Sequence, residues 1–437
     1  MQVNDGVSPP NHDRQGDATW ARGMPMTPDA GSRAPRVHLP RGVIALGFVS
    51  LCMDTSSELV HSLLPVFLVG VLGVSAMSLG IIEGIAEATA AIVKVFSGTV
   101  SDWIGKRKPL VLLGYGLAAL TKPLFPLAQG LGLVLTARFV DRIGKGIRGA
   151  PRDALVADIT PAEFRGAAYG LRQSMDTVGA VAGPGLALFL MAVTHDNFRL
   201  VFWAAVLPAI VAVLLIVFGV QEPEVHANVQ PRRRSPIHRD ELRRLPAAYW
   251  LVIAFATTLT LARFSEAFLL LRASSVGLPA TYVPVVLIVM NVVYAASAWP
   301  FGHWSDRADR RRLLALGIAF LIAADVLLAV ASSTGWVLAG TVFWGLHMGA
   351  TQGLLTTLVA DAAPADLRGT AFGLFNLLTG LALLTASVLA GALWTAIGPA
   401  MTFVTGAGFS VLALIGLLVV TRVIDEDQVG SSRAGLR

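Results

Sequence analysis

Long apolar runs are the feature that most constrains this chain of 437 residues. A helix needs about 20 apolar residues to cross a bilayer, and twelve runs reach that length. They lie at roughly 42–71, 77–100, 109–128, 132–154, 166–192, 199–219, 247–271, 281–303, 313–333, 336–358, 369–393 and 400–421. Only 14% of the residues are charged, against roughly 25% in a soluble domain. The sequence therefore predicts an all-α polytopic membrane protein with twelve transmembrane helices.

Several function classes are disfavoured by what the sequence lacks. Cys52 is the single cysteine, so no intrachain disulfide forms, and it has no metal-ligand partner at a suitable spacing. No nucleotide-binding loop and no nucleophile signature is present. We expect a protein that is not an enzyme and that uses no cofactor, metal or nucleic acid.

Lys and Arg residues in the short loops indicate the orientation. Basic loops occur at 106–108, 232–244 and 307–312. The opposite loops, without Lys or Arg, are at 72–76, 128–131 and 394–399. This alternation predicts a multi-pass inner-membrane protein with both termini in the cytoplasm.

An internal repeat divides the chain into halves. Segment 158–170 matches 361–373 at seven of thirteen positions, offset by 203. A second pair, 98–108 and 302–312, is offset by 204, which indicates duplication. We expect two pseudo-symmetric six-helix bundles with a substrate site between them. The predicted parts are a tail at 1–41, a bundle at 42–219, a linker at 220–246, a bundle at 247–421 and a tail at 422–437.

The repeated loop carries a family resemblance. Segment 98–108, Gly-Thr-Val-Ser-Asp-Trp-Ile-Gly-Lys-Arg-Lys, resembles the major facilitator superfamily signature between the second and third helices. Its signature residues are Gly98, Asp102, Gly105, Lys106 and Arg107. The second copy has Gly302, Asp306, Arg307 and Arg310, with Asp309 in place of the second Gly.

In that superfamily such loops resemble latches that favour one gate state. We expect Asp102 to approach the helix start near Gly369, and Asp306 to approach the one near Gly166, when the inner side is closed. The alternative is that the basic residues of these loops only set topology.

The run at 166–192 contains Gly179, Gly183 and Pro184. This Gly-xxx-Gly-Pro element is similar to the signature of the superfamily's 12-helix drug/proton antiporters, which implies proton-coupled export. Only Gly185 follows the proline, where the family pattern has more glycine. Plain helix packing is the alternative interpretation.

The run at 132–154 carries five cations on one helical face. They are Arg138, Arg142, Lys145, Arg148 and Arg152. Each central cation costs about 2.5 to 3.5 kcal/mol on insertion scales, so this face requires carboxylates, a ligand or a watery cavity. Arg142 also resembles the superfamily's arginine motif that is linked to proton transfer.

Potential partners for these cations lie in the same half. The ionisable groups are Asp54, Glu58, His61, Glu83, Glu87, Lys94, Lys122, Asp141, Arg172 and Asp176. We expect Asp54 and Glu58 on a cavity-facing side of their helix. We also expect Arg142 and Arg148 to be paired, which leaves Lys145 as the most available cation.

The predicted spans of the second half are assigned fewer ionisable residues than those of the first half. Only Arg263, Glu266 and His347 are assigned to its spans, so we expect proton handling in the first half. Seven polar or aromatic residues suit a mostly apolar substrate wall, with helix packing as the alternative: Phe264, Asn291, Tyr294, Trp344, Gln352, Phe375 and Asn376.

The leading hypothesis is a proton-coupled exporter of a small organic or amphiphilic compound, working by alternating access. Asp54, Glu58 or Glu87 would be the protonatable switch. The expected partners are a small-molecule substrate, protons and the lipid bilayer, and we expect a monomer. The alternatives are an importer of an organic anion, which a cationic stripe would bind, and a sensor that does not transport.

Overall fold

A computed structural model describes residues 39–161, 164–222, 242–305, 309–364 and 367–434. Within these ranges the regular structure is helical and contains no strand. Each predicted apolar run coincides with one helix or with an interrupted series of helices. Nine helical segments of the described residues are long and apolar enough to cross a membrane. The predicted all-α membrane fold is confirmed.

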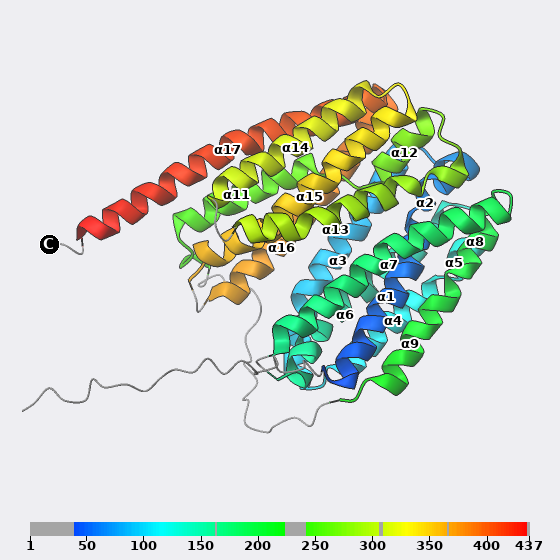
Figure 1. The fold of residues 1–437 in the computed structure, drawn as a ribbon, viewed down its shortest axis with the longest axis horizontal. Helices are drawn as coiled ribbons and strands as arrows, with labels where there is room; N and C mark the ends of the chain where they lie inside the picture. The colour runs from blue at the N-terminus through cyan, green and yellow to red at the C-terminus, as the bar shows by residue number, and fades with distance from the viewer. Residues whose placement is uncertain (1–38, 162–163, 223–241, 306–308, 365–366, 435–437) are drawn as a thin grey trace, which may run out of the picture. The chain divides into compact units, whose positions relative to one another are not determined.

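The first half (Figure 1) consists of ten helical elements in its described residues, nine α-helices and one π-helix, some of them short. They are α1 (Arg41–His61), α2 (Leu64–Val66), the π-helix η1 (Phe67–Val71), α3 (Ala76–Ile104), α4 (Lys108–Thr121), α5 (Leu124–Leu127), α6 (Leu131–Ile159), α7 (Arg165–Val193), α8 (Phe198–Ala204) and α9 (Val206–Gly219).

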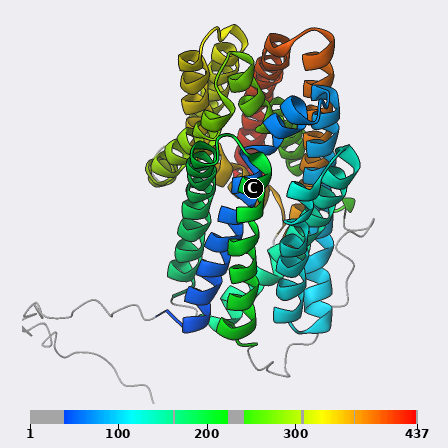
Figure 2. The same cartoon turned by 90° about the vertical axis from the view of Figure 1, so that its right-hand side faces the viewer.

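The second half follows residues 223–241, which lie outside the described part. Its elements are α11 (Ala247–Ala262), α12 (Ala267–Ser275), the 3₁₀-helix η3 (Ala280–Tyr282), α13 (Val285–Ser305), α14 (Arg310–Val330), α15 (Thr334–Ala362), α16 (Arg368–Ala396) and α17 (Pro399–Ala434). Figure 2 shows its yellow to red helices grouped apart from the blue α1 and the green α7 and α9.

Several predicted helices are interrupted rather than continuous. Within the run at 42–71, α1 ends at His61 and α2 begins at Leu64, with Pro65 in its first turn. Proline is tolerated there because the N–H groups of a helix's first turn have no partner within the helix. The run at 199–219 breaks at Ala205, whose carbonyl accepts a hydrogen bond from Ser56 Oγ at 2.7 Å. Hydropathy carries no signal for such breaks.

The predicted helix at 247–271 is the one whose interruption concerns function. The structure ends α11 at Ala262 and starts α12 at Ala267. Ser265 Oγ accepts a hydrogen bond from Ala267 N at 3.3 Å, and Phe268 N donates to Ser265 O at 3.1 Å. A serine that offers the backbone such local bonds favours a helix start over a helix interior. Residues 263–266 therefore form a break, here called the α11–α12 break.

The last helix is longer than the predicted run at 400–421. The helix α17 continues to Ala434, so most of the predicted tail at 422–437 has helical backbone. The predicted tail at 1–41 and the linker at 220–246 lie mostly outside the described residues.

Close backbone contact joins the two halves along α3 and α16. A Cβ atom at Gly80 would lie 2.2 Å from the Ser387 carbonyl oxygen, and one at Gly391 would lie 2.5 Å from the Ala76 carbonyl oxygen. Glycine at these positions is required because any side chain would force the helices apart. Met77 N also donates to Thr395 Oγ1 at 3.1 Å.

A second contact between the halves joins α7 and α13. Asn291 Nδ2 donates to the Ala180 carbonyl oxygen at 3.1 Å. Beyond the end of α7, Thr281 Oγ1 donates to Asp196 Oδ1. These contacts and those of α3 with α16 position the charged residues of the first half opposite the α11–α12 break.

Candidate functional site: a charged cavity between the halves

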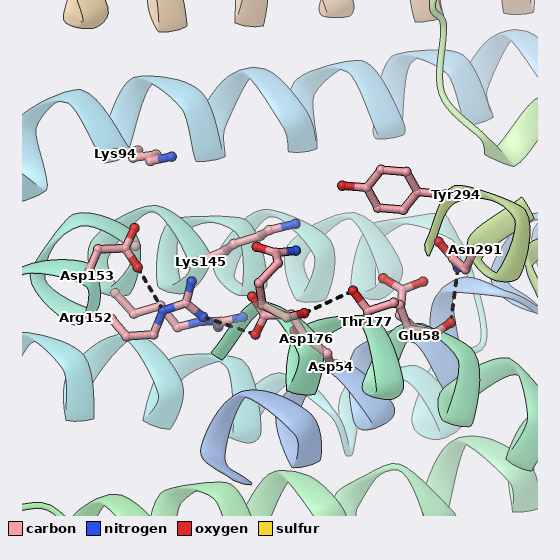
Figure 3. A pocket seen from close by; sticks show the side chains of 14 residues that line it. Asp54, Glu58, Lys94, Lys145, Arg152, Asp153, Asp176, Thr177, Asn291 and Tyr294 are labelled. Carbon is pink, nitrogen blue, oxygen red and sulfur yellow. Dashed lines mark hydrogen bonds and ion pairs between the residues drawn. The ribbon is translucent and has the colours of Figure 1, made fainter. Parts of the chain in front are cut away.

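The predicted site between the halves is a cavity with two chambers. The first chamber, about 320 Å³, is bordered by α1, α3, α6, α7 and α13. The second, about 520 Å³, is bordered by α1, α3 and α6 and by the second half. Glu58, Lys94 and Lys145 line both chambers. Both volumes fall in the range of small-molecule sites, roughly 300 to 1,000 Å³. Figure 3 shows the first chamber.

Asp54 and Glu58 reach the cavity from α1, as their shared helical face predicted. Both side chains are partly buried. Glu58 Oε1 lies 3.8 Å from His61 Nδ1. No ion pair within 4.0 Å involves Asp54 in the described part of the chain, and Figure 3 shows it near Asp176.

The glycines of the antiporter-like element pack on these carboxylate positions. A Cβ at Gly179 would lie 2.9 Å from Asp54 Cβ, and one at Gly183 would lie 2.8 Å from Glu58 Cβ. The same atom at Gly183 would lie 2.7 Å from the Thr55 carbonyl oxygen. The glycines of this element therefore pack the two helices together at the positions of both carboxylates. The packing interpretation and the functional interpretation concern the same contact. Helix α7 runs through Pro184 without ending.

Glu83 is the centre of a buried cluster. Its side chain is 0% exposed, and Oε2 lies 2.6 Å from Arg138 Nη2 and 3.3 Å from His61 Nε2. Arg138 Nη2 also donates to His61 Nε2 at 2.7 Å. Ser265 Oγ of the second half donates to the same Glu83 oxygen at 3.4 Å. The cluster thus links the α11–α12 break to the first half.

Two further ion pairs involve α6. Arg142 Nη1 lies 3.2 Å from Glu87 Oε1, as the expected pairing of Arg142 requires. Lys122 Nζ lies 3.1 Å from Asp141 Oδ1, and both side chains are at most 7% exposed. Asp141 Oδ2 is also 3.7 Å from Arg142 Nε. Much of the cationic stripe is therefore neutralised within the first half.

Lys145 and Lys94 differ from these paired cations. Both are exposed to the cavity, and neither takes part in an ion pair within 4.0 Å among the described residues. They extend from α6 and α3, and Figure 3 shows both ammonium groups along the same chamber. The expectation that Lys145 is the most available cation of its stripe agrees with this geometry.

The expected carboxylate pairing of Arg148 is wrong. Its guanidinium lies over the Tyr115 ring, 4.5 Å from the ring centroid, and Nη1 has no hydrogen-bond partner. A cation over an aromatic face is stabilised by the ring's quadrupole. Arg152 bonds the same tyrosine, with Nη1 3.3 Å from Tyr115 Oη and 3.9 Å from Asp176 Oδ1.

Arg172 and Asp176 form the pair expected from their spacing. The distance from Arg172 Nη1 to Asp176 Oδ2 is 2.9 Å. Arg172 also lies 3.7 Å from Asp153 Oδ1. Asp153 and Asp176, together with Arg152, line the first chamber (Figure 3).

The second half contributes the α11–α12 break to the cavity. All four residues of the break line the second chamber: Arg263, Phe264, Ser265 and Glu266. Arg263 and Glu266 take part in no ion pair within 4.0 Å in the described ranges. Of the predicted wall residues, six line one of the chambers: Phe264, Asn291, Tyr294, Trp344, Gln352 and Asn376. Phe375 packs against the apolar core instead.

Asp325 was not among the predicted site residues. This residue lies in α14 within the predicted run at 313–333, and its side chain is 0% exposed. The assignment of only three ionisable residues to the second half was therefore wrong. A lone acid within an apolar run is itself a signal, since such residues are rare in membrane helices. His347, in contrast, is buried and its Nδ1 donates to the Gly317 carbonyl oxygen at 2.8 Å.

The loop signature has its expected turn in the first half. Gly105 ends α3 with φ +70°, a left-handed conformation that glycine adopts without strain. Lys106 is exposed, and Gly98 lies in ordinary contact with α6. Arg107 Nη1 donates to Ser101 Oγ at 2.6 Å, and Nε lies 3.4 Å from Asp158 Oδ2.

The second loop differs, because Asp309 takes the place of that glycine. It caps α14, with Oδ1 accepting from Arg311 N at 3.0 Å. Arg310 binds Asp361, and Gly302 lies near the end of α13. Asp306 and Arg307, the side chain of Asp102 and the side chain position of Gly369 lie outside the described residues, so the expected latch contacts stay predictions.

Metal binding has no support in this part of the chain. Among the described residues, no three His, Cys, Asp or Glu side chains converge as metal ligands would. The site is a charged cavity with the volume of a small-molecule site.

The family model of the Major Facilitator Superfamily matches residues 46–378, with a second match over 264–435. The chain belongs to this superfamily. It is 32% identical over 391 residues to an uncharacterised MFS-type transporter of Methanocaldococcus jannaschii, a match that covers 88% of this chain and 95% of that protein. It is 23% identical over 344 residues to the quinolone resistance protein NorA of Staphylococcus aureus, covering 77% of this chain and 85% of NorA.

Solved superfamily structures share the fold. A bacterial homologue of the human lysosomal transporter Spinster, in an inward-facing and unoccupied conformation, matches with a TM-score of 0.71 and 14% identity. The match covers 90% of this chain and 99% of the other. The resemblance predicted from residues 98–108 is confirmed. The chain is a multi-pass membrane protein of a transporter family and not an enzyme.

Proposed function

We propose that this superfamily member is a proton-coupled exporter of a small organic or amphiphilic compound, with Glu58 as the main proton-binding switch. One observation carries the proposal: Glu58 borders both chambers of the cavity. Gly183 of the antiporter-like element also packs closely on the Glu58 Cβ atom. A carboxylate there changes its surroundings whenever the halves move relative to each other.

The other candidate switches have less freedom. Glu87 is ion-paired with Arg142, and Glu83 is buried with Arg138. Asp54 borders only the first chamber. We assign Asp54 a supporting role and the Glu83 cluster a role in holding the halves together. The similarity to the quinolone resistance protein NorA supports export of an amphiphilic compound.

The test is transport in proteoliposomes with an imposed pH gradient. Suitable probes are norfloxacin, ethidium and 1-naphthoate, which are zwitterionic, cationic and anionic. We expect accumulation of at least one probe to require the gradient. Glu58→Gln should abolish this gradient-driven accumulation while exchange of labelled probe continues, and Glu58→Asp should restore coupling in part. Gradient-driven accumulation by Glu58→Gln at the wild-type rate would contradict the assignment.

A second candidate function, import of an organic anion, is favoured by the unpaired cavity cations. Lys94, Lys145 and Arg263 line the second chamber without ion pairs among the described residues. A carboxylate or phosphate in contact with them would gain charge-assisted hydrogen bonds. Uptake of 1-naphthoate in preference to ethidium, driven inward by the gradient, would favour this function. Binding of a probe without any flux would instead favour a sensor.

We further propose an inner-membrane location, with both termini in the cytoplasm and a monomer as the working unit. The exposed Lys106 and the Lys and Arg residues in the sequences 106–108, 232–244 and 307–312 support this orientation. Reporter fusions at residues 437 and 130 test it. A fluorescent cytoplasmic reporter should be active at 437 and inactive at 130.

A further inference from the structure

The strongest unexplained feature outside the cavity is the environment of Asp325. Its side chain is 0% exposed, and in the described part of the chain neither Oδ1 nor Oδ2 has a hydrogen-bond partner. Its neighbours in the core of the second half include Leu321 and Leu328, both also 0% exposed. An ionised carboxyl group without donors is strongly unfavourable in such a place. A cation in contact with the Asp325 carboxylate would neutralise its charge.

Among the described residues, no cation of the elements that pack against α14 takes that role. Arg272 of α12 donates instead to the carbonyl oxygens of Leu328 and Ala331, at 2.9 and 2.7 Å. His347 of α15 bonds Gly317. The remaining titratable groups near these elements are occupied elsewhere: Arg263 and Glu266 line the cavity, Tyr294 of α13 bonds Gln352, and His303 stacks on Trp299.

The structure also provides room for the carboxyl group. A Cβ atom at Gly406 of α17 would lie 2.9 Å from Asp325 Oδ2 and 3.0 Å from Phe264 Cε1. The absence of a side chain at Gly406 thus leaves space that the carboxyl group and the Phe264 ring share. Phe264 borders the second chamber on its other side, where it packs against Trp344 with ring centroids 5.7 Å apart.

We propose that Asp325 is a second proton-binding site, in the second half, which is protonated in this conformation and screened from the cavity by Phe264. The inference rests on the proposed proton coupling and adds a site to it. Loss of the proton to water leaves a carboxylate, so this step needs no other reactant. Because no donor or cation of the described residues bonds the carboxyl group, the carboxylate form requires contact with cavity water.

The α11–α12 break supplies a route to that contact. Phe264 precedes Ser265, which bonds Glu83 of the first half at 3.4 Å. Ser265 N also donates to Ser387 Oγ at 3.2 Å. When the halves separate at this place, the hydrogen bond between Ser265 and Glu83 is lost, and residues 263–266 become free to move. Phe264 then turns away, and Asp325 releases its proton into the cavity.

Infrared spectroscopy of the purified full-length chain tests the site without a substrate. We expect the carbonyl stretch of a protonated carboxylic acid at neutral pH in the wild type. Asp325→Asn should lose this band. Asp361→Asn is the matched control, because Asp361 is exposed and ion-paired with Arg310, and it should keep the band. Identical spectra for the wild type and Asp325→Asn would overturn the proposal.

The role of Phe264 is tested by the pH titration of the same band. Phe264→Ala should lower the midpoint of the titration by about one pH unit or more, because water then stabilises the carboxylate. An unchanged midpoint in a folded Phe264→Ala protein would overturn the screening. A transport assay distinguishes the proton-binding site from proton coupling. If the infrared band behaves as expected but transport does not depend on the pH gradient, Asp325 remains a proton-binding site and the proposed proton coupling is wrong.

Discussion

Arg310 forms an ion pair with Asp361, with 3.1 Å between Nη1 and Oδ2, and the two residues that precede them by 203 positions form an ion pair as well. These residues are Arg107 and Asp158, at 3.4 Å. The duplication detected in the sequence is therefore repeated as a contact. In each half a basic residue of the signature loop is tied to the end of a long helix, at the place where the repeated segment begins.

We expect these loop pairs to affect the rate of switching more than stability. Asp361 is 61% exposed, and exposed pairs contribute about 0 to 1 kcal/mol. Asp361→Asn should leave the thermal unfolding temperature nearly unchanged but alter the transport rate. The exchange of charges, Arg310→Asp with Asp361→Arg, should recover the rate. Loss of folded protein in Asp361→Asn alone would contradict this prediction.

The contact between α7 and α1 gives a prediction with a matched control. A methyl group at Gly183 would meet the Thr55 carbonyl oxygen at 2.7 Å, so Gly183→Ala should lower the free energy of unfolding by roughly 1 to 3 kcal/mol. Gly185→Ala, two residues on, meets nothing within 4 Å and should be neutral. Thermal unfolding in detergent measures both. Equal effects of the two substitutions would argue against the close contact.

The different surroundings of Arg142 and Lys145 predict different phenotypes. Arg142→Gln leaves Glu87 without its ion-pair partner, and such loss costs about 3 kcal/mol or more in buried pairs. Because Glu87 is partly exposed, we expect a smaller but clear loss of folded yield. Lys145→Gln should fold normally and selectively weaken the apparent affinity for 1-naphthoate. Equal loss of protein in both variants would leave the stripe as scaffold.

The Lys122–Asp141 pair should show strong coupling. Lys122→Met leaves Asp141 buried with only the more distant Arg142 nearby, at 3.7 Å, which should cost about 3 kcal/mol of unfolding free energy. Lys122→Met combined with Asp141→Leu should recover much of that loss. A double-mutant cycle of unfolding measures it. Additive effects of the two substitutions would show that the pair is not coupled.

The Asp196–Thr281 hydrogen bond between the halves gives a test of alternating access. Cys52 is the only native cysteine, so Cys52→Ser provides a clean background. A disulfide between Asp196→Cys and Thr281→Cys should block transport, and a reductant should restore it. Full transport by the crosslinked protein would mean that this end does not open.

Part of this architecture follows from hydrophobicity and spacing alone. The apolar runs, the two halves and the partnership of Arg142 with a carboxylate were predictable, because cations on one face of a membrane helix require partners. The placement of Asp54 and Glu58 on the cavity side followed from their shared helical face.

The remainder depends on contacts that a sequence does not display. The α11–α12 break relies on bonds of one serine, which hydropathy cannot register. Arg148 stacks on Tyr115, and nothing in the spacing distinguishes a ring from a carboxylate as its partner. Asp325 was overlooked because it belongs to no periodic pattern, although its isolation was visible.

The packing of Gly179 and Gly183 against α1 has a mechanical consequence. With no side chains between the two backbones, α1 and α7 lack a compressible layer at the level of Asp54 and Glu58. A change in charge that displaces either carboxyl group would therefore move α1 and α7 together, as one rigid pair of helices, rather than a single side chain.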